Sequence, residues 1–151
     1  MKTKAGLGVA VWFVLASCAK DANKTEEPWG NTPIPKPTAD LQWVDLDPTG
    51  APGAKIATLW GDPTKGGFGA FFKLPAGFAV PLHTHTNAMK VVIVSGTYLQ
   101  APDGKPEFRL GPSSYLMQPG DNYRHTTSCD KASECVFFVE SNGAFDLHLV
   151  K

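Results

Sequence analysis

Neither sign of charge is in excess in this chain of 151 residues, which carries 14 basic and 14 acidic side chains. That balance excludes the strongly basic surface of a typical nucleic-acid-binding protein. The N-terminal apolar run, residues 5–17, has only 13 residues and is too short to span a bilayer. An amphipathic helical pattern and an internal repeat are also lacking, which argues against a helical bundle and a solenoid.

Turn-forming and aromatic residues are abundant instead, with 15 Gly, 13 Pro and 9 Phe. From residue 41 onward, about ten short apolar or alternating stretches are each bounded by Gly or Pro, which predicts a single all-β domain, a sandwich or barrel. Continuous apolar stretches, Val91–Val94 and Val136–Val139, predict strands buried on both faces. The turn Asn142-Gly143 predicts a two-residue β-hairpin.

The N-terminus has the pattern of an export signal. Lys2 and Lys4 precede the apolar run of residues 5–17, which has the length of a signal-peptide core. The run ends in the sequence LASC, which resembles the bacterial lipobox. This resemblance implies a lipoprotein signal peptide at 1–17, lipidation of Cys18, and attachment to an extracytoplasmic membrane surface, either periplasmic or at the outer membrane. An ordinary secretory signal ending in a chance Cys is the alternative.

Residues 18–40 differ from the rest of the chain in composition. They contain four prolines, several charges and few apolar side chains, and they cannot form a packed core. We interpret 18–40 as a lipidated Cys followed by a disordered Pro-rich tether. The folded domain is then expected to cover 41–151.

All four histidines lie in this predicted domain: His83, His85, His125 and His148. His83 and His85 are two residues apart, so a strand projects both imidazoles from the same face. A third histidine from a later strand would complete a site for a divalent metal ion, provided that the imidazoles are neutral. The alternative is a set of hydrogen-bonded histidines inside a barrel.

The spacing Gly77-x5-His83-x-His85-x3-Met89-x6-Gly96 resembles the first motif of the cupin superfamily (RmlC-like), with Met89 at the position of the family's Glu. Gly111, Pro119-Gly120 and His125 are similar to the second motif. There, His125 comes one residue late and Cys129 stands in the place of the final Asn. More narrowly, the stretches LWGDP, HTHT…VVIVSGTY and HTTSC…ECVFFVESNGAFDLH look like a bacterial cupin family of unknown function related to ChrR-type anti-sigma zinc cupins.

This resemblance implies a double-stranded β-helix, a jelly-roll barrel, with His83, His85 and His125 as metal ligands. Zinc, iron, manganese, nickel and copper are not distinguished by it. Strand alternation turns Met89 inward and Lys90 outward, so Met89 is a candidate fourth ligand, suited to copper(I), or else it fills the core. A site of three histidines with open positions is a known catalytic arrangement even without the carboxylate.

Cys129 and Cys135 flank a five-residue loop, which predicts a disulfide outside the cytoplasm. The alternative for Cys129 is a thiolate ligand, because it shares a strand face with His125. In the last strand, His148 alternates with apolar residues and is expected to face solvent; a role near the cavity is the other interpretation. Glu140, Asn87 and Tyr98 are further candidates for polar groups in the cavity.

Two functions fit these residues. The first is a metal-dependent enzyme, such as a dioxygenase of a small molecule, with an apolar cavity wall formed by Phe71 or Phe72, Val91, Ile93, Tyr115 and Met117. The second is a non-catalytic cupin module that binds metal or a ligand, as a sensor or structurally. A metal-free barrel is a third interpretation. The expected partners are a small molecule and the membrane, with no nucleic acid; a homodimer is an option because cupins often dimerise.

Overall fold

The structure is a computed structural model that describes residues 32–47 and 51–151. The predicted signal peptide, Cys18 and most of the predicted tether lie outside the described residues. The folded unit covers Pro35–Lys151. In the described part of the chain, no helix is long and apolar enough to cross a membrane.

The described residues contain one 3-10 turn, η1 (Thr38–Asp40), and are otherwise built from β-strands. In chain order, the strands are β1 (Val44–Asp47), β2 (Ala51–Gly61), β3 (Phe68–Leu74), β4 (Ala79–Thr84), β5 (Met89–Ser95), β6 (Tyr98–Pro102), β7 (Phe108–Leu110), β8 (Tyr115–Gln118), β9 (His125–Cys129), β10 (Cys135–Ser141) and β11 (His148–Leu149). The all-β prediction is confirmed.

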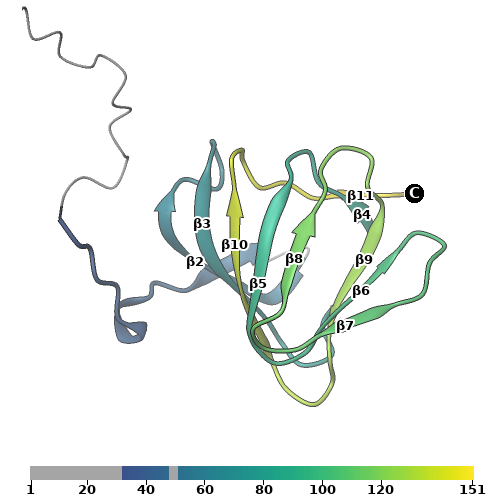
Figure 1. Cartoon of the computed structure of the whole chain (residues 1–151), viewed down its shortest axis with the longest axis horizontal. Coiled ribbons are helices and arrows are strands. Elements are labelled where there is room, and N and C mark those ends of the chain that lie inside the picture. The colour runs from purple at the N-terminus through teal and green to yellow at the C-terminus, as the bar shows by residue number, and fades with distance from the viewer. Residues whose placement is uncertain (1–31, 48–50) are drawn as a thin grey trace, which may run out of the picture. The chain divides into compact units, whose positions relative to one another are not determined.

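The strands form two antiparallel sheets, in the orders β1-β2-β3-β10-β5-β8 and β11-β4-β9-β6-β7. Figure 1 shows β2, β3, β10, β5 and β8 following one another across the first sheet. A late strand lies between two early strands in each sheet: β10 between β3 and β5, and β9 between β4 and β6. This interleaving is the jelly-roll arrangement, and it brings residues far apart in sequence into register.

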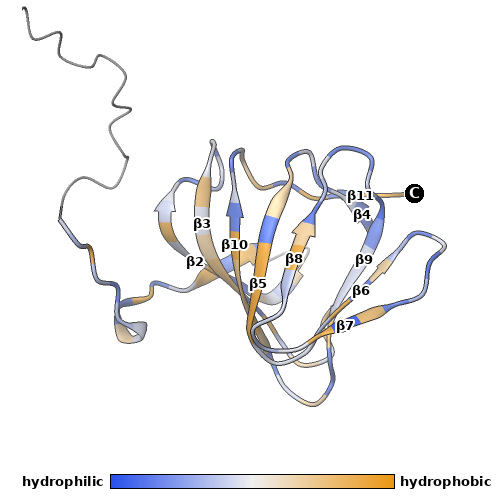
Figure 2. Ribbon diagram, in the orientation of Figure 1, coloured by the Kyte–Doolittle hydropathy of each residue, from blue (hydrophilic) through white to orange (hydrophobic). Residues whose placement is uncertain are grey.

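The hydrophobic core lies between the sheets and is rich in aromatic rings. Phe72 of β3 stacks on Phe137 of β10 with ring centroids 5.7 Å apart, and Phe72 also contacts Phe145, at 5.1 Å. Because alternate side chains of a strand point to opposite faces, only one face of each strand enters this core. Figure 2 shows a hydrophilic band within β5 and a hydrophilic end on β10, with hydrophobic colour along most of both strands.

Two predictions about strand environment are wrong. In β5, Val91 and Ile93 are buried, while Val92 and Val94 are 37% and 49% exposed, so this apolar run has one outward face. Residues 136–139 also alternate between buried and half-buried. The outer face of the first sheet is therefore more apolar than strand alternation alone would require.

The predicted hairpin at Asn142-Gly143 is also wrong. β10 ends at Ser141 and pairs with β3 and β5, whereas β11 pairs with β4 in the other sheet. The chain therefore crosses between the sheets after this turn. Sequence alone could not show this, because a tight turn reports a reversal of direction and not which strands pair.

Cys129 and Cys135 form a disulfide that joins the end of β9 to the start of β10, and both side chains are buried. Because the bridge closes a loop between strands of different sheets, it restricts the unfolded chain. We expect the double substitution Cys129→Ala with Cys135→Ala to lower the free energy of unfolding by about 2 kcal/mol, the value for so short a loop. Urea unfolding of both proteins measures this. An unchanged urea midpoint after reduction of the parent protein would contradict it.

Candidate metal centre

His83 and His125 are brought together by the pairing of β4 with β9. They are direct partners across the two strands, and their ring centroids lie 4.2 Å apart. The register of this pair is irregular between Val80 and His83, and the Nδ1–H of His83 donates to the carbonyl of Pro81 over 2.6 Å. Such irregularities often re-aim a side chain, and here the hydrogen bond fixes the His83 ring toward His125.

His85 lies just beyond the end of β4 and is held by the C-terminal segment. Its Nδ1–H donates to the backbone carbonyl of Asp146 over 2.5 Å, and its ring lies 5.5 Å from that of Phe145. The Asp146 carboxylate accepts a 2.8 Å hydrogen bond from the backbone N–H of Thr86. The segment before β11 therefore orients His85 from both sides.

The loop after His85 also packs tightly against the turn before β9. A Cβ atom on Gly120 would lie 2.6 Å from the Thr86 carbonyl oxygen and 2.8 Å from the backbone nitrogen of Ala88. Only glycine allows this approach, which explains the glycine at position 120. The loop that carries His85 and the turn that leads into His125 are thereby held together.

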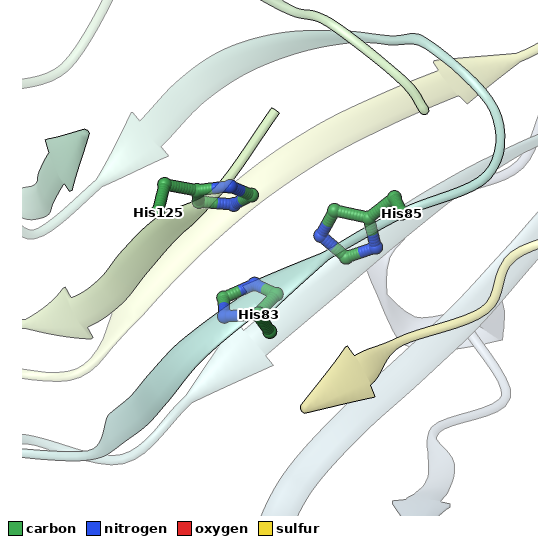
Figure 3. A group of neighbouring side chains, drawn as sticks. All are labelled: His83, His85 and His125. Carbon is green, nitrogen blue, oxygen red and sulfur yellow. The ribbon is translucent and has the colours of Figure 1, made fainter. Parts of the chain in front are cut away.

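The three imidazoles form one buried cluster. Their ligand nitrogens lie within 4.8 Å of one another, and Figure 3 shows the rings of His83, His85 and His125 turned toward a common space. Because the Nδ1 atoms of His83 and His85 donate to carbonyls, Nε2 is the unprotonated nitrogen of both rings. The Nδ1 of His125 lies 3.3 Å from the carbonyl of Tyr123 and 3.3 Å from the amide nitrogen of Gln118, so it is protonated when it donates to Tyr123 and unprotonated when it accepts from Gln118.

Burial keeps these histidines neutral. The pKa of His83 is lowered to about 4, mainly by desolvation and in part by the neighbouring His85. Desolvation likewise lowers the pKa of His125 to about 4, with His83 adding to the effect. The pKa of His85 is also lowered, again mainly by burial. Neutral imidazoles with free Nε2 atoms are the form that binds a metal ion.

These lowered pKa values make the metal-free protein sensitive to acid. Below pH 6.5 the unfolded chain takes up protons at His83 and His125, while the folded chain does not until about pH 4. We expect the free energy of unfolding in EDTA to fall by about 1.5 kcal/mol for each of these histidines between pH 6.5 and about pH 5. Urea titrations at several pH values measure it, and the variant with Gln at both positions should lose this slope. Equal stability at both pH values would contradict the expectation.

A chain of buried polar side chains lies behind His125, and sequence analysis did not find it. The Tyr98 hydroxyl donates to Gln100 over 2.9 Å, Gln100 donates to Gln118 over 2.9 Å, and the Gln118 amide lies 3.3 Å from Nδ1 of His125. Burial raises the pKa of Tyr98 to about 12, so its hydroxyl stays protonated. No sequence pattern marks such glutamines, because Gln100 lies on β6 and Gln118 on β8, strands of different sheets that meet only in the folded protein.

Met89 is buried and faces inward, and Lys90 is exposed and pairs with Glu140, as strand alternation predicted. Met89 is the direct cross-strand partner of Gln118 and lines the same cavity as the histidines. The position of the cupin carboxylate thus contains a thioether beside the three imidazoles.

The histidines open into a cavity of about 850 Å³. Its walls are mostly apolar, and the lining includes Leu46, Ala54, Ile56, Phe72, Leu74, Phe78, Val80, Val91, Phe137, Val139 and Phe145. Of the predicted wall residues, Phe72 and Val91 line it. Tyr115 and Met117 do not, because their side chains are 58% and 53% exposed on the outer face of β8. Phe71 also faces outward, packing on Phe138, and Ile93 is buried outside the lining.

The remaining predicted residues have other positions. The side chain of His148 is 61% exposed and contacts Asp146 and Thr86 on the outside of the cluster. Cys129 is in the disulfide, which contradicts its alternative role as a thiolate ligand. Asn87 donates to the carbonyl of Ala144 over 2.9 Å and braces a loop. Tyr98 lines the cavity.

The residues present fit a divalent metal ion. The cluster contributes three neutral nitrogen donors, and each ring has a backbone carbonyl within hydrogen-bonding distance of Nδ1. Three protein ligands leave open coordination positions, and the cavity gives a small molecule access to them. As metal ligands, His83, His85 and His125 stay a prediction.

Residues 19–148 match the family model described as "Domain of unknown function (DUF4437)". No curated protein is significantly similar to the chain in sequence.

Solved structures with the same fold include the polyketide cyclase RemF from Streptomyces resistomycificus. It has a TM-score of 0.67 and 15% identity, over 80% of this chain and 87% of that one. The DMSP lyase DddQ from Ruegeria pomeroyi DSS-3 has a TM-score of 0.60 and 22% identity, over 74% of this chain and 62% of that one. An RmlC-like cupin from Shewanella frigidimarina has a TM-score of 0.57 and 15% identity, over 72% and 89%. At these identities, the likeness establishes a cupin fold alone.

Proposed function

This chain belongs to the DUF4437 family, whose description assigns no activity, and from the site itself we propose that it is a metal-dependent enzyme acting on a small molecule. One observation carries the proposal: three neutral, oriented histidines lie in the wall of a cavity of about 850 Å³. A purely structural metal site is usually closed by protein ligands, whereas an open one gives a substrate access to the ion. The cyclase and the lyase named above act on small molecules from the same fold.

The roles of the chain's own residues follow from their contacts. His83 and His85 would hold the ion through Nε2, since Nδ1 of each donates to a backbone carbonyl, and His125 would do so in the tautomer whose Nδ1 donates to Tyr123. The ion would supply Lewis acidity and positions for a chelating substrate together with O2 or water. Phe72, Val91 and the other apolar wall residues would exclude water and orient the substrate body.

We take oxygenase chemistry as the specific reaction class, because three neutral ligands leave the full charge of the ion available to O2 and a chelating substrate. The test is oxygen consumption by protein loaded with iron, manganese, nickel or copper, against a panel of small thiols and dicarbonyl compounds. Uptake that requires both metal and one substrate class, and that disappears in the His83→Ala variant, is the expected result. Absence of uptake with every metal and substrate would contradict this reaction class.

The second candidate is a non-catalytic module that binds a metal or ligand. It is favoured by the composition of the described site: the metal-type cluster contains three histidines and no acidic residue or cysteine. Stoichiometric zinc that resists exchange and does not bind small chelators would favour this candidate over the enzyme.

We also propose that the protein is a lipoprotein held at an extracytoplasmic membrane surface through Cys18. The support is the order of Lys2 and Lys4, the apolar run and the lipobox-like sequence before Cys18. We expect radiolabelled palmitate to be incorporated by the parent chain and not by the Cys18→Ser variant. Equal labelling of both, or release of the parent as a free periplasmic protein, would contradict the proposal.

A further inference from the structure

The described cavity walls lack the basic side chains that commonly bind charged metabolites. Among the residues that the structure describes, neither Lys nor Arg lines the cavity. The charged lining residues, apart from any proton on histidine, are Asp45, Asp47 and Asp62. A carboxylate or phosphate group on a ligand would therefore meet no cationic side chain in the walls.

Two of these aspartates are already paired with lysines. Asp45 accepts a 2.8 Å hydrogen bond from Lys55, whose ammonium group is outside the cavity lining. Asp62 is paired with Lys65 at 2.8 Å and accepts from the Thr64 hydroxyl at 2.6 Å. These hydrogen bonds hold the pKa of Asp62 at about 2, so it is ionised in all ordinary buffers. The charged groups of the lining are therefore carboxylates, and Asp45 and Asp62 are each compensated by a lysine that lies outside the lining.

Inside the cavity, the polar wall groups are satisfied by one another. Tyr98 bonds to Gln100 and Thr127, and Gln100 bonds to Gln118. In the described part of the chain, no buried side-chain nitrogen or oxygen lacks a hydrogen-bond partner. A ligand with several polar groups would lose hydration without gaining partners, except at the histidines and any ion they hold.

The mouth of the cavity is apolar as well. Val44 on β1 and Leu149 on β11 both line the cavity and are 57% and 61% exposed, and Leu147 is 38% exposed. Grouped exposed apolar side chains at an opening are typical of an entry point for a hydrophobic ligand.

We infer that the substrate is an uncharged, predominantly apolar small molecule, and that its one polar end is directed to the three histidines. This inference adds a ligand class to the proposed function, and it rests on that function in calling the ligand a substrate. A volume of about 850 Å³ lies within the range of about 300–1,000 Å³ typical of sites for drug-sized ligands. Anionic metabolites are selected against by the walls, because burial removes their hydration and no cationic side chain of the described lining replaces it.

The test compares two probes of the same shape, 2-naphthol and 2-naphthoate, by isothermal titration calorimetry at neutral pH. The full chain is used after EDTA treatment, so that the walls act without an ion. We expect 2-naphthol to bind at least about tenfold more tightly than 2-naphthoate. Equal affinities, tighter binding of 2-naphthoate, or no binding of either probe would overturn the inference.

A matched pair of variants locates the effect in the cavity. Val44→Arg places a cation at the mouth, whereas Val94→Arg adds the same charge at an exposed position on β5 outside the lining. The ratio of the dissociation constant of 2-naphthoate to that of 2-naphthol should fall at least about fivefold in Val44→Arg and stay unchanged in Val94→Arg. The same change in both variants would assign the preference to net charge and overturn the inference. The metal content of the untreated protein tests the proposed enzyme independently. If the protein contains no metal but still prefers 2-naphthol, the proposed enzyme is refuted and the inferred ligand class stands.

Discussion

Replacing His83 and His85 together by Ala should reduce bound metal from about one ion per chain to less than about a tenth. The reason is geometric: His125 alone cannot chelate an ion, and the two removed rings contribute two of the three neutral nitrogens of the cluster. Inductively coupled plasma mass spectrometry of the chain, purified without a polyhistidine tag, measures the effect directly. The identity of the lost metal would also narrow the reaction class.

The control for this experiment is His148→Ala. His148 is the fourth histidine of the chain, but it lies outside the cluster and is largely exposed, so the variant should keep the metal content of the parent. Far-ultraviolet circular dichroism confirms that each variant is folded. If parent and double variant are equally free of metal, even after incubation with each candidate ion, the metal-dependent function fails and Met89 marks a site without a metal.

The substitution Gly96→Ala should cost more stability than Gly104→Ala, although both glycines have positive φ. Gly96 has φ +75° in the turn between β5 and β6, and an added Cβ would lie 2.2 Å from the carbonyl oxygen of Glu134 and 2.9 Å from Cα of Cys135. Backbone atoms at these distances must move, and the Cys135 backbone is fixed by a disulfide and by pairing with β3. We expect a loss of more than about 3 kcal/mol in the free energy of unfolding, measured by urea titration.

Gly104→Ala separates the two contributions to this loss. Gly104 also has positive φ, at +68°, but nothing lies within 4 Å of its Cβ position. Gly104→Ala should therefore lower the free energy of unfolding by about 1 kcal/mol, the cost of placing a side chain at positive φ without any steric clash. If the two variants lose the same stability, the close approach of the β9–β10 loop to Gly96 contributes nothing, and our account of this turn is wrong.

Strand alternation and motif spacing predicted much of this architecture. The i and i+2 positions of His83 and His85, the inward direction of Met89 and the exposure of His148 all follow from a two-residue period. Pairing does not follow from it. The partner of β11 is β4 and not β10, because a turn sequence carries no information about which sheet the chain enters next.

The cavity was predicted less well than the cluster. Tyr115 and Met117 were expected in its wall, since apolar side chains in strands usually face a core, yet β8 is an edge strand with these side chains outward. Gln100 and Gln118 were missed for the opposite reason: a polar residue is expected at the surface unless a partner is known. Both errors come from inferring direction from residue type when cross-strand neighbours decide it.

The interleaving of the strands also determines when the histidine cluster can exist. His83 and His125 face each other only after β9 has entered the sheet beside β4, and no local segment of the chain contains the whole set. Formation of the cluster therefore requires a long chain closure, and it belongs to the native state and not to early local structure. An ion that prefers the assembled cluster would bind the native chain and not the unfolded one, so adding it would slow proteolysis and raise the melting temperature in proportion to its affinity.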